Sequence, residues 1–244
     1  MIKQFRDRVE AGRLLAVRLA AYSNRSDVLV LALPRGGVPV GYEISHMLHA
    51  PLDVMIVRKL GVPGQEELAM GAIASGGIRV LNYDVVHTMG IPEAVINEVA
   101  AREQRELERR ERLYRENRPP CSIQGRIVML VDDGIATGST MQAAISVVKQ
   151  QEPAHIIIAV PIAAAATCDK FVAQGDELVC VLKPEMLYAI GVWYEQFTQT
   201  SDEEVRALLK RASQEYTAWV QEQMQQGISI TAGKNKMGKA RGGA

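Results

Sequence analysis

The stretch MLVDDGIATGSTM, residues 129–141, places two adjacent carboxylates between an apolar run and a loop of small and hydroxylated residues. The apolar run RIVMLV (126–131) is typical of a strand buried in a parallel sheet. A helix is predicted to begin at Ser139, and backbone N–H groups in a loop of small residues before a helix bind phosphate. The carboxylates of Asp132 and Asp133 accept hydrogen bonds from a pair of neighbouring hydroxyls. A ribose 5-phosphate would satisfy both halves of the stretch.

The loop differs from two common phosphate-binding motifs. A Walker A loop has a lysine directly after its second glycine. Here Gly134 and Gly138 are closer together than in that motif, and Ser139 stands where the lysine would be. A dinucleotide-binding G-x-G-x-x-G is also absent from the sequence. The simpler interpretation, an aspartate pair that ends a strand before an ordinary helix cap, leaves the string of small residues unexplained.

The rest of the chain alternates between predicted strands and helices. Continuous apolar runs predict buried strands at 27–33, 52–57, 126–131, 155–162 and 177–183. Helices are predicted at 5–22, 38–49, 139–150, 163–174 and 202–225, the last with Ser201 as its N-cap. A hairpin is predicted from 68–74 and 78–81. Because this alternation implies right-handed crossovers, the predicted fold class is α/β, a doubly wound, mainly parallel sheet with flanking helices.

Residues 92–118 form a segment of a different character. They predict a long, charged helix with four ion pairs in the favourable order: Glu98–Arg102, Glu106–Arg110, Glu108–Arg112 and Glu111–Arg115. Its apolar stripe is narrow, so we interpret it as a solvated helix packed along one seam. A homodimer in which this helix meets a second copy stays an alternative.

Length and composition predict one globular domain over 1–226 and a disordered tail over 227–244. Lys plus Arg equals Asp plus Glu, 28 each, so no overall charge points to nucleic acid. No apolar run is long enough to span a membrane. The three widely spaced cysteines fit neither a disulfide framework nor a zinc site, and we expect a cytoplasmic protein.

Two further loops are expected at the same edge of the sheet, because ligands of open parallel sheets bind beyond the carboxyl ends of the strands. PRGG (34–37) follows the first strand, and its Arg35 can bind an anion with two nitrogens. VRKLGVPG (57–64) follows the second strand and carries the basic pair Arg58 and Lys59. The histidines show no metal-binding spacing, and no protein metal site is predicted.

MLVDDGIATGSTM closely resembles the PRPP (5-phosphoribosyl 1-pyrophosphate) motif of type I phosphoribosyltransferases. The resemblance covers roughly residues 25–185. It implies that Asp132 and Asp133 are the catalytic pair and bind the ribose hydroxyls. It also implies 5-phosphate contacts from Ala136, Thr137, Gly138, Ser139 and Thr140.

The other two loops resemble segments of the same family. PRGG is similar to the family's pyrophosphate loop, which implies pyrophosphate contacts from Arg35, Gly36 and Gly37 and a non-proline cis peptide before Arg35. VRKLGVPG is similar to the segment that leads into the catalytic loop of the adenine and orotate enzymes. This similarity adds Arg58 and Lys59 to the implied pyrophosphate contacts.

The implied reaction transfers ribose 5-phosphate from PRPP to a small-molecule acceptor, usually a nitrogen of a base, and releases pyrophosphate. Mg²⁺ would be carried by the oxygens of PRPP rather than by a protein site. A lid that closes over the site would exclude water, and Gly61–Glu67 is the candidate. Two alternatives stay open: a non-enzymatic regulator that senses PRPP, and a hydrolase or phosphorylase acting on ribose phosphates.

Acceptor choice in the family lies in a variable hood, here expected from the N-terminal helix and about 184–200. Ala136 stands where the 6-oxopurine enzymes have Asp, which argues against hypoxanthine and guanine. The candidate lid lacks the additional Lys and His typical of orotate enzymes, whereas adenine stays open. Trp193, Tyr194 and Phe197 are candidates either to stack on a base or to anchor the hood to the core.

Overall fold

The computed structural model describes residues 4–116, 118–174 and 177–227. Within these ranges, a five-stranded parallel sheet has the order β2-β1-β6-β7-β8. Its strands are β1 (Val28–Ala32), β2 (Leu52–Val54), β6 (Ile127–Val131), β7 (His155–Ile162) and β8 (Glu177–Leu182). Because this order requires crossovers between parallel strands, the predicted α/β class with a mainly parallel sheet is confirmed.

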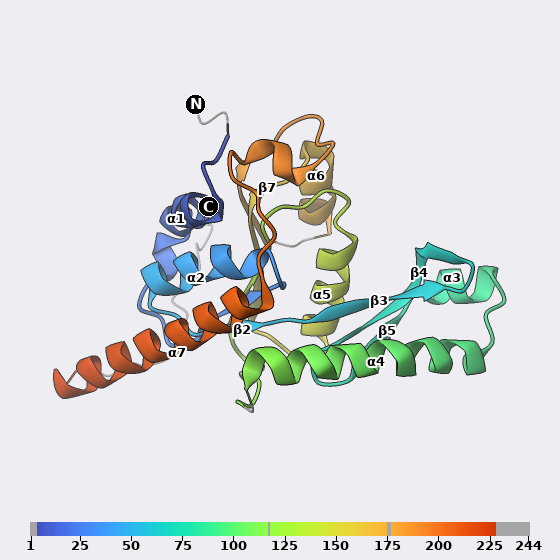
Figure 1. Cartoon of the computed structure of the whole chain (residues 1–244), viewed down its shortest axis with the longest axis horizontal. Helices are drawn as coiled ribbons and strands as arrows, with labels where there is room; N and C mark the ends of the chain where they lie inside the picture. The colour runs from blue at the N-terminus through green and yellow to red at the C-terminus, as the bar shows by residue number, and fades with distance from the viewer. Residues whose placement is uncertain (1–3, 117, 175–176, 228–244) are drawn as a thin grey trace, which may run out of the picture.

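Helices cover both faces of the parallel sheet (Figure 1). The helices are α1 (Arg8–Arg18), α2 (Gly37–Leu48) and α7 (Asp202–Gln225) on one side, and α5 (Ser139–Lys149) and α6 (Ala165–Ala173) on the other. Side chains along β1 alternate between two hydrophobic clusters: Val28 and Val30 belong to the cluster on the α2 side, and Leu29 and Leu31 to the cluster on the α5 side. The sheet is therefore buried on both faces, as its uninterrupted apolar strands predicted.

The N-terminal helix begins later than predicted. The sequence indicated a helix from residue 5, but α1 begins at Arg8 because the Asp7 side chain accepts a hydrogen bond from Glu10 N at 2.8 Å and caps the helix. Phe5 instead forms a β-bridge with Tyr194 and is fully buried. The N-terminal segment is thereby tied to the region around the short 3₁₀ helix η2 (Ile190–Trp193).

A second, antiparallel sheet contains β3 (Val57–Val62), β4 (Gln65–Ala74) and β5 (Ile78–Leu81) in that order. The predicted hairpin over 68–81 is confirmed, but the predicted strand over 52–57 is wrong in one respect. Strand β2 ends at Val54, and the chain crosses to the second sheet, where Ser75 N donates to the Ile56 carbonyl at 3.0 Å. A continuous apolar run carries no signal for this change of sheet, because both parts are buried.

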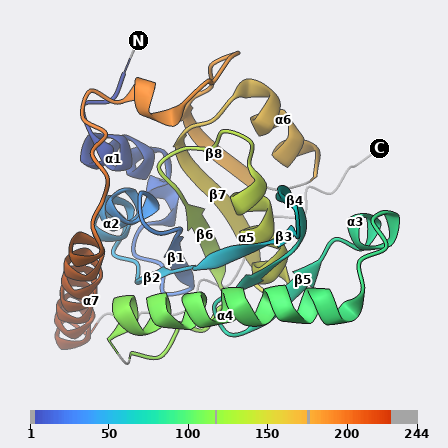
Figure 2. The ribbon, with the colours of Figure 1, turned by 45° about the vertical axis from the view of Figure 1, so that its right-hand side comes forward.

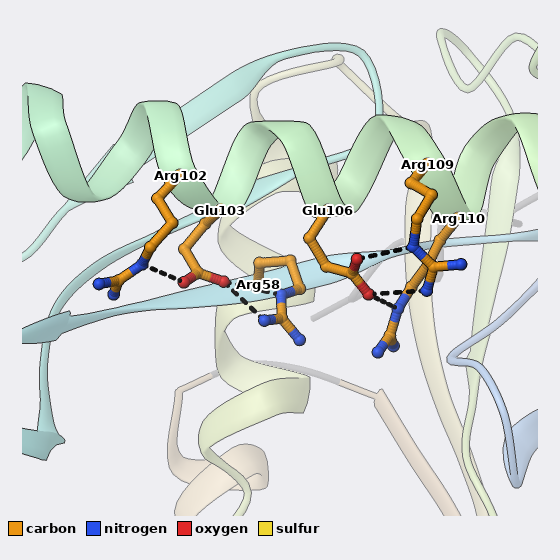
Figure 3. A network of polar contacts seen from close by, with 6 residues as sticks. All are labelled: Arg58, Arg102, Glu103, Glu106, Arg109 and Arg110. Carbon is orange, nitrogen blue, oxygen red and sulfur yellow. Dashed lines mark hydrogen bonds and ion pairs between the residues drawn. The ribbon is translucent and has the colours of Figure 1, made fainter.

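The predicted charged helix is α4 (Glu93–Arg115), which follows the short α3 (Tyr83–Thr88) and runs along the second sheet (Figure 1 and Figure 2). Ile96, Val99, Leu107 and Tyr114 form its buried seam, and half of its charged residues are exposed. Three of the four predicted pairs are present: Glu106–Arg110, Glu108–Arg112 and Glu111–Arg115. Arg102 bonds instead to Glu103 at 3.2 Å (Figure 3).

Two further sequence predictions concern the C-terminal tail and membrane-spanning segments. The predicted disordered tail over 227–244 lies outside the described residues except for Gly227. No helix within the described ranges is both long and apolar enough to cross a membrane.

Candidate functional site

The acidic pair lies at the carboxyl end of β6, near the middle of the parallel sheet. Asp133 N donates a hydrogen bond to Asp132 Oδ1 at 2.9 Å. The Asp133 carboxylate in turn accepts a hydrogen bond at 2.8 Å from Arg8 Nε of helix α1. Burial, and then the charge of Asp133, raises the pKa of Asp132 well above its ordinary value. Burial also raises the pKa of Asp133, and the Arg8 guanidinium opposes that rise.

The PRGG loop packs directly against the acidic pair. Leu33 N donates to the Val131 carbonyl at 2.8 Å, which continues the pairing of β1 with β6 into the loop. The Pro34–Arg35 peptide bond is cis, as the resemblance implied. A Cβ atom at Gly36 would lie 2.0 Å from Asp133 Oδ2, and one at Gly37 would lie 2.6 Å from the Val131 carbonyl oxygen. Only glycine allows the two loops to approach this closely.

The predicted 5-phosphate loop encloses a cavity of about 210 Å³. The cavity is lined by Asp132, Gly134, Ile135, Ala136, Thr137, Gly138, Ser139, Thr140, Met141 and Ile190. Gly138 has φ +80°, in the left-handed region, and precedes the first residue of α5. The first N–H groups of α5 therefore lie beside the cavity, together with the positive end of the helix dipole. All five predicted 5-phosphate residues thus meet Asp132 around one cavity.

The predicted pyrophosphate residues are not all brought to one place. Arg35 is one-third exposed, and its Nη1 atom lies 3.8 Å from Asp202 Oδ1 at the start of α7. Arg58, on β3, donates to Glu103 of α4 at 2.9 and 2.6 Å (Figure 3). Lys59 is exposed and, as the next residue of the strand, projects from the opposite face to Arg58. The structure therefore places the backbone next to Arg35 against the acidic pair, while the Arg35 side chain reaches toward α7 and the Arg58 side chain toward α4.

The candidate lid, Gly61–Glu67, covers the end of β3, the turn at 63–64 and the start of β4. The strand pairing shifts register at Gly61, where a Cβ atom would lie 2.8 Å from the Glu66 carbonyl oxygen. Gly64 N donates to Glu66 Oε1 at 3.2 Å, so the Glu66 carboxylate caps the turn. A closing movement of this segment stays a prediction.

Tyr194 cannot stack on a ligand in this structure, because its side chain is only 3 % exposed. Its hydroxyl donates to the Asp133 carbonyl at 2.7 Å, and its ring packs against Phe5 and Phe197. Of the two roles considered for this residue, the structure supports the anchoring role. Phe197 is about one-third exposed, with the Arg8 guanidinium 3.9 Å from the centre of its ring. No pattern in the sequence pointed to Arg8 as part of this site, since it lies 125 residues from its partner Asp133.

Three of the histidines contact side chains of other elements. His46 bonds to Glu215 at 3.0 Å, His155 bonds to Glu177 at 2.6 Å, and His49 stacks on Trp219. In the part of the chain that the structure describes, no three His, Cys, Asp or Glu side chains are grouped to hold a metal ion.

Comparison with known proteins identifies the family. A family model described as "Phosphoribosyl transferase domain" matches residues 1–176. The chain belongs to the phosphoribosyltransferase family. The resemblance drawn from residues 129–141 is therefore confirmed at the level of the family.

Two relatives of this phosphoribosyltransferase chain come from Mycobacterium tuberculosis, strains CDC 1551 and H37Rv, and both are named "Putative phosphoribosyl transferase". Each is 47% identical over 215 residues, which cover 88% of this chain and 48% of the relative. The chain thus spans about half the length of these curated relatives. A crystal structure of TT1426 from Thermus thermophilus is similar with a TM-score of 0.78 and 40% identity, covering 85% of this chain and 98% of that one.

Proposed function

We propose that this phosphoribosyltransferase chain transfers ribose 5-phosphate from PRPP to a nitrogen of a base. The bond from C1 of the ribose to the pyrophosphate oxygen breaks, and its electron pair leaves with the pyrophosphate. A bond from C1 to the acceptor nitrogen forms, and the acceptor loses a proton. Positive charge develops on the ribose ring during this exchange, so the site must stabilise the leaving diphosphate and exclude water.

The observation that carries this proposal is the close packing of three elements at the carboxyl edge of the sheet. The acidic pair, the 210 Å³ cavity and the PRGG loop each suit a different part of PRPP. Asp132 lines the cavity and can accept hydrogen bonds from ribose hydroxyls, while the N–H groups of residues 136–140 bind the 5-phosphate. We expect the backbone of Gly36 and Gly37 and the Arg35 side chain to contact the diphosphate.

This arrangement also indicates roles for Mg²⁺, Lys59 and Arg58. Mg²⁺ bound to PRPP oxygens would neutralise part of the diphosphate charge. Lys59, on the opposite face of β3 from α4, is the second candidate to contact pyrophosphate. Arg58 would have to leave Glu103 before it could take part.

The alternative function of a PRPP sensor that binds nucleic acid receives less support from α4. This helix contains six arginines and six glutamates, and many of them pair with one another. Glu106, for example, accepts hydrogen bonds from Arg109 and Arg110 (Figure 3). Because its six arginines are balanced by six glutamates, α4 carries no net positive charge to attract a phosphate backbone. We also place the protein in the cytoplasm, where its three free cysteines would stay reduced.

Calorimetry with PRPP, with and without Mg²⁺, tests the proposal. The wild type is expected to bind PRPP when Mg²⁺ is present, and the double variant Asp132→Asn/Asp133→Asn is expected to lose that binding. Glu93→Gln, which changes an exposed carboxylate at the first residue of α4 that does not line the cavity, is the matched control. Binding would then justify a panel of bases scored by pyrophosphate release. Wild-type protein that binds no PRPP, or a double variant that binds it as well as the wild type, would refute the proposal.

A further inference from the structure

Arg8, the first residue of α1, joins the acidic pair to the segment around 194–198. Its Nε and Nη2 atoms both lie 2.8 Å from Asp133 Oδ2, and its Nη1 atom donates to the Thr198 carbonyl at 2.8 Å. The guanidinium also lies over the ring of Phe197. The side chains of Arg8 and Asp133 are each only 12 % exposed. An arginine with these contacts is fixed in position rather than free in solvent.

The two carboxylates of the pair have different surroundings. Asp132 lines the 210 Å³ cavity, whereas Asp133 is not among the residues that line it. The Asp133 carboxylate lies instead between Arg8 and the backbone of Gly36 in the PRGG loop. The pair is therefore asymmetric: one carboxylate borders the cavity, and the other joins α1 to the PRGG loop.

This asymmetry matters for the charge of the site. Two adjacent carboxylates repel a ligand that carries several phosphate charges. Arg8 supplies a positive charge in direct contact with one of them, so the pair presents about one net negative charge instead of two. The same guanidinium charge opposes the rise in pKa that burial causes in both Asp132 and Asp133.

We infer that Arg8 is a positioning residue of the PRPP site: it neutralises and orients Asp133, so that Asp132 can bind the ribose hydroxyls without repelling the phosphates. This inference rests on the proposed function and assigns a role to a residue outside the PRPP motif. Because the same guanidinium holds Thr198 and Phe197, it also joins the 194–198 segment to the ribose site.

The role of Arg8 also predicts a pH dependence. Besides the backbone of Gly36, the groups that face the Asp133 carboxylate and its backbone are Arg8, Asp132 and the Tyr194 hydroxyl. Burial raises the pKa of Asp133, and Arg8 is the cation that limits the rise. Without Arg8, Asp133 would stay protonated and uncharged to higher pH, and the repulsion that Arg8 prevents would appear only above that pH.

The test compares Arg8→Ala and Arg8→Lys with Arg6→Ala by calorimetry with Mg²⁺ and PRPP across a pH series. Arg6 is exposed on the preceding turn and bonds only to Asp7 through its side chain, so it is the matched control. We expect Arg8→Ala to weaken PRPP binding about tenfold at neutral pH, since a hydrogen-bonded charge pair contributes enough for one such factor. The loss should grow at higher pH, where Asp133 ionises without a cation beside it and repels the phosphates. Arg8→Lys keeps the charge but loses the two-nitrogen contact, so its affinity for PRPP should lie between those of the wild type and Arg8→Ala.

A double-mutant cycle separates this role from a general effect on folding. If Arg8 acts through Asp133, its removal should have little further effect in an Asp133→Asn background, where no charge needs neutralising. Circular dichroism of each variant checks that it is folded. If Arg8→Ala does not fold, Arg8→Lys still tests the inference. Variants that bind PRPP as tightly as the wild type at every pH would overturn the inference and leave the proposed function standing. A wild type that binds no PRPP would overturn both.

Discussion

The contact between the PRGG loop and the acidic pair predicts a large effect from one methyl group at Gly37. A Cβ atom there would lie 2.6 Å from the Val131 carbonyl oxygen and 2.9 Å from Asp132 Cα. The first distance is about 0.8 Å shorter than the 3.4 Å at which ordinary contact begins. Both atoms belong to the backbone at the end of a central strand, so neither can turn aside. The PRGG loop would have to move away from the acidic pair instead.

The size of the effect follows from two opposing contributions. Overpacking of a buried site costs about 1–3 kcal/mol. Replacing glycine by alanine in a helix returns up to about 1 kcal/mol, and less at Gly37 because it is the first residue of α2. We therefore expect Gly37→Ala to lower the free energy of unfolding by about 1–2 kcal/mol and to weaken PRPP binding as well.

Urea unfolding and calorimetry measure the two effects, and Gly36→Ala is the informative companion. A Cβ atom at Gly36 would meet only the carboxylate of Asp133, which can rotate away from Arg8. This variant should therefore lose PRPP affinity with a smaller loss of stability than Gly37→Ala. A Gly37→Ala protein with wild-type stability and wild-type affinity would refute the claim that the two loops must touch.

Three further variants probe the charges of the fold. Arg115→Ala should cost about 3–5 kcal/mol in urea unfolding, because it leaves the buried Asp53 carboxylate without its 3.0 Å partner. Asp132→Asn should stabilise the unliganded protein by about 1 kcal/mol at pH 7.5, since burial raises the pKa of this group and its ionisation therefore costs stability as pH rises above 3.8. Glu106→Gln should cost about 0.5 kcal/mol at neutral pH, because the side chain is 30% exposed. Hydrogen bonds from its two arginine partners lower the pKa of Glu106 to about 2, so this loss should fade as pH falls from 4.5 toward 2.

Each of these predictions has a result that would contradict it. For Arg115, the companion Arg112→Ala removes an exposed arginine from the same helix and should change stability little. Equal effects of the two variants would mean that burial of the ion pair does not matter. An Asp132→Asn protein that is less stable than the wild type at pH 7.5 would show that the carboxylate stabilises the fold. For Glu106, a difference from the wild type that is independent of pH would exclude a charge effect.

Much of the fold was predictable from local sequence. Apolar runs located the five parallel strands to within a few residues, apart from the early end of β2 at Val54. The cap of α7 was also predictable, and Glu204 N donates to Ser201 Oγ at 3.1 Å. The meeting of residues 34–37 with the acidic pair followed from one rule, because the carboxyl ends of parallel strands lie at the same edge.

Other features depend on contacts between distant segments. The change of sheet after Val54 left no mark in the sequence, since the residues on both sides of it are buried and apolar. The direction of Arg58 was equally hidden: a basic residue at a strand end can face either side, and only the position of Glu103 on α4 decides it. Tyr194 was a candidate for ligand stacking until its burial against Phe5 was known.

The sequence by itself therefore determined the family and the strands, and it predicted the loop that we propose to bind a ribose phosphate. Each of these depends on short-range patterns: burial along a strand, small residues before a helix, and carboxylates at a strand end. Only the tertiary structure decided how the two carboxylates differ, because Arg8 reaches Asp133 across 125 residues of chain. No spacing rule relates residues so far apart, and their contact depends on how α1 packs beside the parallel sheet.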